Sequence, residues 1–136
     1  MLIMTSIRFV RGPIPVRNPE VRVRLLFVCA RNRLRSPTAE AVFGAILGIE
    51  AESAGVASDA DNPVTPEQIT WADIVLVMEP AHRAKLVRMF PSALRGKRVV
   101  CLDIPDEYGL MDAELITLLW KRVPPFVPAV SAGKPE

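Results

Sequence analysis

The sequence predicts a three-layer α/β fold in which a four-stranded parallel sheet carries helices on both faces. Four short apolar segments alternate with segments of helical periodicity, which is typical of parallel strands joined by right-handed crossovers. Residues 25–28 and 74–78 are continuous apolar runs, as expected of strands buried on both faces. In such sheets, ligands bind at the carboxyl ends of the strands.

In the first half of the chain, we expect a strand over 23–28 and a helix over 36–47, which Gly48 would end. A strand over 49–53 follows, and its low apolar content predicts a position at the edge of the sheet. Residues 56–64 have the composition of a loop.

In the second half, a short helix over 65–70 precedes the most apolar strand, 74–78, which we expect at the centre of the sheet. The elements expected after it are a helix over 80–89, a strand over 97–102, a polar loop over 103–109 and a helix over 112–123 capped by Asp112. The charged face of the 80–89 helix carries His82, so we predict this histidine at the surface.

Two segments of different composition flank a folded domain over residues 21–123. Residues 1–20 are basic and interrupted by glycine and proline, which predicts an N-terminal extension. This extension either binds an anionic partner or has no function, and its lack of a motif favours the second interpretation. Residues 124–136 contain four prolines and predict a loose tail.

Composition restricts the class of protein. A chain of 136 residues, 50% of them apolar, suits one globular domain, and a net charge of +2 does not indicate nucleic-acid binding. No apolar run reaches transmembrane length, so we expect no membrane association. Two cysteines, Cys29 and Cys101, do not indicate a disulfide scaffold, which favours the cytoplasm. One histidine and two distant cysteines make no metal site, and we expect no cofactor.

The segment between the first strand and the first helix predicts an oxyanion-binding loop. Cys29 ends the strand, Ser36 is a suitable N-cap, and Pro37 suits the first helical position. A loop that enters a helix directs backbone N–H groups toward one point, and the guanidinium of Arg35 complements a three-oxygen anion. Such a field also stabilises a thiolate. We therefore expect phosphoryl transfer to Cys29, followed by hydrolysis of the thiophosphate.

This reaction needs an acid for the leaving oxygen and later a base for water, and one carboxyl group can serve as both. Asp103 and Asp106 follow the 97–102 strand and therefore lie at the same end of the sheet as Cys29. Asp106 lies further from the strand and has more reach, whereas Asp103 is better placed to hold the loop. Position alone leaves open that both are ordinary turn residues.

The chain resembles the low-molecular-weight protein tyrosine phosphatases over residues 23–123, and within them a compact branch of predicted phosphatases. The matching motifs are, in chain order, Cys29-x5-Arg35-Ser36 with Asn32 inside it, Ser-Ala-Gly at 53–55 and Pro-Asp-Glu-Tyr at 105–108. The resemblance implies the phosphotyrosine phosphatase I-like fold. It also implies hydrolysis of phosphotyrosine in proteins or of small aryl phosphates, and a loop that holds phosphate or sulfate.

By this resemblance, Cys29 is the nucleophile, Arg35 binds the phosphoryl oxygens and Asp106 is the general acid. Tyr108 would flank the aromatic ring of the substrate, and Ser36 would donate a hydrogen bond to the thiolate. Asn32 and Ser53 would brace the loop. The loop residues expected to surround the phosphoryl group are Ala30, Arg31, Asn32, Arg33, Leu34 and Ser36.

The chain also departs from the family pattern. Glu107 replaces the usual proline after the acid, and Leu34 occupies the place of a second cysteine that protects the nucleophile in many members. Arg31 and Arg33 make the loop unusually basic, which would favour multiply charged substrates or further stabilise a thiolate.

Two other functions fit parts of this pattern. An arsenate reductase of the same fold would use the same loop but would need a further thiol, and Cys101 lies within an apolar strand. A non-catalytic oxyanion-binding module would keep the loop and use the basic extension and the proline-rich tail as partner sites. The combination of Cys29, Arg35 and Asp106 favours the enzyme.

Overall fold

The computed structural model describes residues 23–135. The N-terminal extension predicted over residues 1–20 therefore lies outside the described residues. No helix within 23–135 is long and apolar enough to cross a membrane.

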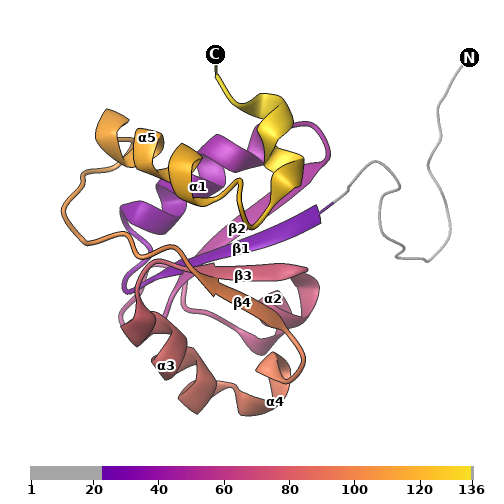
Figure 1. Ribbon diagram of the computed structural model, residues 1–136. Coiled ribbons are helices and arrows are strands. Elements are labelled where there is room, and N and C mark those ends of the chain that lie inside the picture. The colour runs from indigo at the N-terminus through magenta and orange to yellow at the C-terminus, as the bar shows by residue number, and fades with distance from the viewer. Residues whose placement is uncertain (1–22, 136) are drawn as a thin grey trace, which may run out of the picture.

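A four-stranded parallel sheet forms the middle layer, as the sequence predicts (Figure 1). Its strands are β1 (Val23–Cys29), β2 (Ile49–Gly55), β3 (Ile74–Val77) and β4 (Arg98–Cys101). They lie in the order β2-β1-β3-β4, so the second strand is at an edge and the apolar 74–77 strand is internal, both as expected. Cys29 pairs with Gly55 at the carboxyl end of the sheet, and Val77 pairs with Cys101 there.

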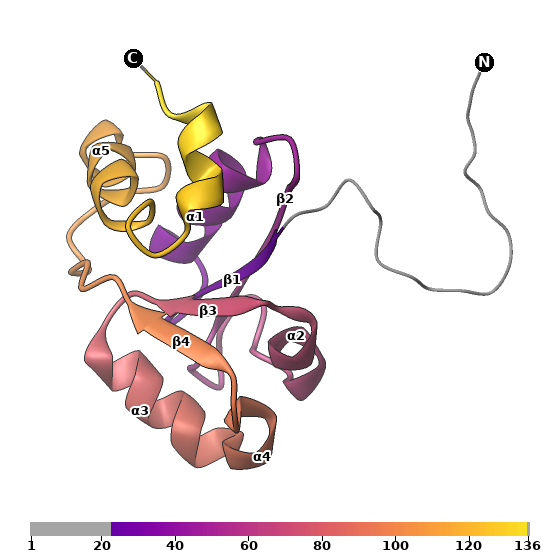
Figure 2. The ribbon, with the colours of Figure 1, turned by 45° about the vertical axis from the view of Figure 1, so that its right-hand side comes forward.

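Helices cover both faces of the sheet (Figure 2). On one face lie α1 (Arg35–Gly44), α5 (Ala113–Arg122) and the 3-10 helix η2 (Pro128–Gly133). On the other lie α2 (Pro66–Trp71), α3 (Pro80–Met89) and α4 (Pro91–Leu94). Each strand alternates between two cores: Phe27 and Cys29 face α1 and α5, whereas Val28 and Cys101 face α2 and α3. The three-layer prediction is confirmed.

The C-terminal segment packs on the core, so the prediction of a loose tail is wrong for residues 124–135. Val127 and Val130 are almost completely buried beside Val123 and the α5 side of the sheet. Burial of apolar side chains three and four positions apart holds the 3-10 turns in place. The proline count predicted irregular backbone but carried no information about these valines.

Helix α1 ends three residues earlier than predicted, at Gly44, and a turn leads to Gly48. Gly48 therefore does not end the helix, contrary to the prediction; its φ of 88°, a left-handed value that favours glycine, instead reverses the chain into β2. Asp112 caps α5 as predicted, because its carboxylate accepts the Glu114 backbone N–H at 2.8 Å.

Candidate active site

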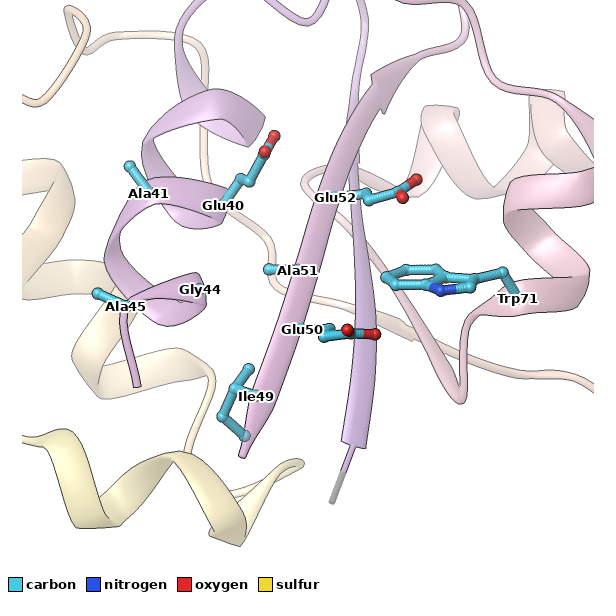
Figure 3. A pocket seen from close by; sticks show the side chains of 9 residues that line it. All are labelled: Glu40, Ala41, Gly44, Ala45, Ile49, Glu50, Ala51, Glu52 and Trp71. Carbon is cyan, nitrogen blue, oxygen red and sulfur yellow. The ribbon is translucent and has the colours of Figure 1, made fainter. Parts of the chain in front are cut away.

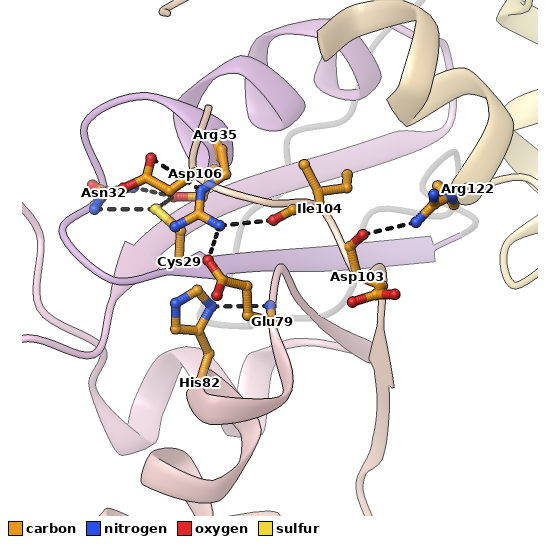
Figure 4. Close-up of polar contacts among 10 residues, drawn as sticks. Cys29, Asn32, Arg35, Glu79, His82, Asp103, Ile104, Asp106 and Arg122 are labelled. Carbon is orange, nitrogen blue, oxygen red and sulfur yellow. Dashed lines mark hydrogen bonds and ion pairs between the residues drawn. The ribbon is translucent and has the colours of Figure 1, made fainter. Parts of the chain in front are cut away.

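The segment after β1 wraps around the sulfur of Cys29. Cys29 is 3% exposed, and the backbone N–H of Asn32 points at its Sγ over 3.2 Å. Asn32 has a φ of 57°, a left-handed conformation that turns this N–H inward. Figure 4 shows Asn32 beside the sulfur of Cys29. The Sγ also lies 3.0 Å from the hydroxyl of Ser36, which accepts a 2.9 Å hydrogen bond from the Asn32 amide. The structure therefore surrounds the sulfur with groups that stabilise negative charge.

Ser36 does not cap the helix, contrary to the prediction. Helix α1 begins at Arg35, with Leu34 as its N-cap and no capping side chain. Ser36 lies in the first turn and is completely buried against Cys29. Its hydroxyl is used by the site rather than by a backbone N–H of the helix. Glu40 lies further along α1, and its carboxylate accepts a hydrogen bond from the Ser53 hydroxyl.

Arg35 is fixed at the floor of the site. Its side chain is 3% exposed, and Nη1 donates to the Ile104 carbonyl over 2.8 Å and to the Glu79 carboxylate. These two bonds use both hydrogens of Nη1, so Nε and Nη2 remain for a ligand. Nε lies 3.6 Å from Asp106 Oδ1, and the Asp106 side chain is 65% exposed. An acid and a guanidinium thus flank the sulfur.

These groups enclose a small pocket of about 190 Å³. Its lining residues are Cys29, Ala30, Arg31, Arg33, Leu34, Arg35 and Asp106. Tyr108 is not among them; it is half-buried and packs against the core on the α5 side. Ser53 lies behind α1, where it donates to Glu40. Asp103 has a φ of 56°, and its carbonyl accepts a 2.8 Å hydrogen bond from Arg122.

The segment after β2 supports this loop from behind. The backbone N–H groups of Val56 and Ala57 donate to the carbonyls of Cys29 and Ala30 at 3.0 and 2.8 Å. Gly55 permits this approach, because a Cβ there would lie 2.5 Å from the Ala30 carbonyl oxygen. Backbone hydrogen bonds therefore join the start of the sulfur loop to the segment after β2.

The two extra arginines of the loop are already paired. Arg31 Nε lies 3.3 Å from Asp59, and Arg33 Nε lies 3.1 Å from Asp61. The hydrogen bond and positive charge of Arg31 lower the pKa of Asp59. The local charge is therefore close to balanced, which weakens the expectation that these arginines favour multiply charged substrates.

Glu79 and His82 were not identified from the sequence as site residues. His82 is 6% exposed, so the prediction of a surface histidine is wrong. Its Nδ1 accepts the Glu79 backbone N–H at 3.1 Å, and burial, followed by the charge of Arg35, lowers its pKa. Glu79 follows β3 by two residues, and the rule that singled out Asp103 and Asp106, an acid after a strand, could have found it.

A larger pocket, of about 650 Å³, lies beside the edge strand β2 (Figure 3). It is lined by Glu40, Glu50 and Glu52, with Trp71 across from them. These carboxylates would repel a phosphate, so size does not identify the reactive site here. Among residues 23–135, no group of three histidines, cysteines or acids is placed to hold a metal ion.

Fold and site together define a class of α/β proteins that hold a cysteine inside an oxyanion-shaped loop at the end of a parallel sheet. The chain matches the family described as low molecular weight phosphotyrosine protein phosphatase over residues 24–71. A protein-arginine-phosphatase of Geobacillus stearothermophilus is 32% identical over 94 residues, which cover 52% of this chain and 64% of that protein's length.

Two solved structures extend the match beyond the first half of the chain. YwlE arginine phosphatase from Geobacillus stearothermophilus has a TM-score of 0.63 and 26% identity, covering 85% of this chain and 99% of that chain. Vibrio vulnificus Wzb in complex with benzylphosphonate has a TM-score of 0.58 and 25% identity, covering 81% and 95%. The chain is therefore similar to the low molecular weight phosphotyrosine protein phosphatases in sequence over residues 24–71 and in fold over most of the described residues, which confirms the resemblance drawn from the sequence.

Proposed function

We propose that this chain is a protein phosphatase that hydrolyses phosphate monoesters through a cysteinyl-phosphate intermediate. The observation that carries the proposal is the 190 Å³ pocket in which Cys29, Arg35 and Asp106 meet. Relatives named as arginine phosphatases, and a structure of Vibrio vulnificus Wzb in complex with benzylphosphonate, support an oxyanion in this pocket. Phosphate or sulfate would bind there as well.

In the first step, the Cys29 sulfur attacks phosphorus. The backbone N–H groups of the loop and the Nε and Nη2 of Arg35, which the Glu79 and Ile104 bonds leave available, hold the three equatorial oxygens. A P–S bond forms and the P–O bond to the alcohol breaks, while Asp106 gives its proton to the leaving oxygen. Asp106 suits this role because it lies on the open side of the pocket.

In the second step, water attacks the phosphorus of the cysteinyl-phosphate. Asp106, now a carboxylate, takes a proton from that water, the P–S bond breaks and phosphate leaves. The departing thiolate is stabilised by the Ser36 hydroxyl and by the Asn32 N–H. Ser53 supports the loop only indirectly, because its hydroxyl donates a hydrogen bond to Glu40 on α1 and not to a loop residue. Asp103 holds the base of the acid segment through Arg122.

Phosphotyrosine in proteins is the substrate that we propose first, because the family motifs imply it. Phosphoarginine is the second candidate, since both the sequence match and the solved structure from Geobacillus stearothermophilus are named as arginine phosphatases. Hydrolysis of matched phosphotyrosine and phosphoarginine peptides separates the two. A higher kcat/KM for the phosphoarginine peptide would move the assignment.

Arsenate reduction is less well supported. Cys29 and Cys101 face opposite sides of the sheet, so Cys101 is poorly placed to resolve an adduct on Cys29. A reduction by external thiols stays open to assay with arsenate. We also propose a cytoplasmic location, where reducing conditions keep the thiol free.

The test compares wild-type protein with Cys29→Ser on p-nitrophenyl phosphate. Wild type should turn over the ester and show phosphorus bound to sulfur after a rapid acid quench. Cys29→Ser should lose turnover by on the order of 10⁴-fold or more yet still bind vanadate. A wild-type protein that binds vanadate without turnover would instead be a binding module.

A further inference from the structure

One buried hydroxyl joins the two loops of the candidate site. Thr38, in α1, is completely buried. Its Oγ1 donates to the Leu34 carbonyl at 2.7 Å and accepts the Met111 backbone N–H at 2.9 Å. Leu34 lines the reactive pocket, and Met111 ends the segment that carries Asp106. A single side chain therefore links the sulfur loop to the acid segment.

The conformation of Met111 shows that its backbone is held there. Its φ is 58°, a left-handed value that persists in a residue other than glycine when the surrounding structure imposes it. Met111 is 48% exposed, so packing of this residue is a weak constraint. The hydrogen bond to Thr38 is the contact that joins this backbone to α1.

The opposite end of the acid segment is anchored independently. The Ile104 N–H donates to the Met78 carbonyl at 2.7 Å, and the Ile104 carbonyl accepts from Arg35 at 2.8 Å. Asp106 thus lies between an anchor at Ile104 and an anchor at Met111. Both anchors lead directly to residues of the sulfur loop or of the helix that follows it.

We propose that Thr38 is a positioning residue that keeps Asp106 over the sulfur of Cys29. This inference rests on the proposed phosphatase function. When the hydroxyl is absent, the Met111 N–H loses its acceptor, and the acid segment loses its hydrogen bond to α1. Asp106 then meets the leaving oxygen less often, and the loss is greatest for esters whose leaving group most needs a proton.

The experiment uses Thr38→Val, which keeps the branched shape, and Thr38→Ser, which keeps the hydroxyl. Thr117→Val is the matched control, since Thr117 bonds within α5 at an exposed position. Thr38→Val should lower kcat/KM for phenyl phosphate by about 10-fold, part of the 10²–10⁴ that a general acid supplies. For p-nitrophenyl phosphate, a better leaving group, the loss should be smaller. Thr38→Ser and Thr117→Val should resemble wild type on both esters.

A second measurement does not depend on turnover. Amide hydrogen exchange across residues 105–111 should be faster in Thr38→Val than in wild type, whereas Thr38→Ser should keep the protection. Unchanged exchange would overturn the anchoring role. An equal loss on both esters with weaker vanadate binding would mean that Thr38 merely supports the sulfur loop, and would also overturn the proposal. If wild type hydrolyses neither ester, the phosphatase function fails while exchange still decides the anchor.

Discussion

The sulfur loop and the acid segment lie at the same end of the sheet but are built differently. In the sulfur loop, the side chains of Cys29, Asn32, Arg35 and Ser36 are all buried, and they bond to one another or to neighbours at the ends of β2 and β3. In the acid segment, Asp106 is mostly exposed, and the backbone is held at Ile104 and Met111. One region is fixed, and the other is tethered at its ends.

The difference follows from the proposed chemistry. Charge develops on sulfur and on the phosphoryl oxygens at fixed positions, and donors that are already oriented lower the barrier without reorganisation. The acid must instead admit a substrate, give up a proton and then accept one from water. A segment held only at its ends lets the acid move aside for the substrate and return to the reacting oxygen, whereas a buried acid would close the pocket.

Removal of the acid should give the largest effect within this comparison. Asp106→Asn should lower kcat/KM for phenyl phosphate by roughly 10²–10⁴-fold, because the leaving oxygen departs without a proton. The falling alkaline limb of the pH profile for p-nitrophenyl phosphate hydrolysis should disappear. Asp103→Asn is the matched control and should change little, since its carbonyl rather than its carboxylate is engaged. A normal profile for Asp106→Asn would transfer the role to Asp103.

A methyl group added to each region tests which one is rigid. In Gly55→Ala, the new Cβ would meet the Ala30 carbonyl oxygen at 2.5 Å, so the sulfur loop must shift. We expect a loss of about 2 kcal/mol in the free energy of unfolding and roughly 10²-fold in activity. Gly109→Ala, in the acid segment, meets nothing within 4 Å and should stay within about 0.5 kcal/mol of wild type. If urea unfolding and turnover assays showed equal effects for the two variants, the sulfur loop would be no more rigid than the acid segment.

The Glu79 carboxylate should matter through the geometry of Arg35. Glu79→Gln weakens a charge-assisted hydrogen bond to Nη1 and should lower kcat by about 10-fold. KM should change less, because the substitution also removes a negative charge that repels an anionic substrate. Glu67→Gln, in the exposed first turn of α2, controls for the loss of charge. Unchanged kcat would show that the sulfur loop orients Arg35 unaided.

The smallest expected effect concerns His82 and pH. Burial lowers its pKa below the ordinary value of 6.5, so the unfolded chain binds a proton that the folded chain resists. Stability should therefore fall as pH drops below about 6.5 and level off below the folded pKa. His82→Gln keeps an acceptor for the Glu79 N–H but does not titrate. Denaturant unfolding at several pH values should show this decline in wild type beyond that of the variant, and parallel curves would contradict it.

The local sequence pattern was sufficient to predict site residues that lie close together in the chain. Cys29, Asn32 and Arg35 fall within one strand, loop and helix, so their spacing predicted the pocket that the structure shows. The sheet was equally predictable, because apolar runs and helical periods are read over a few residues. The tail was not, since it is ordered by packing against α5 and the sheet rather than by its own composition.

The sequence by itself determined the parallel sheet, the position of the sulfur and the guanidinium that accompanies it. Tertiary structure alone decided that Glu79 holds Arg35 across 44 residues and that Thr38 reaches Met111 across 73. Periodicity describes which face of an element is buried, but it does not state which distant polar atoms meet once the layers close. These contacts between distant polar atoms depend on strand order and on the pairing of buried hydrogen-bond donors. Strand order and burial exist only in the folded chain.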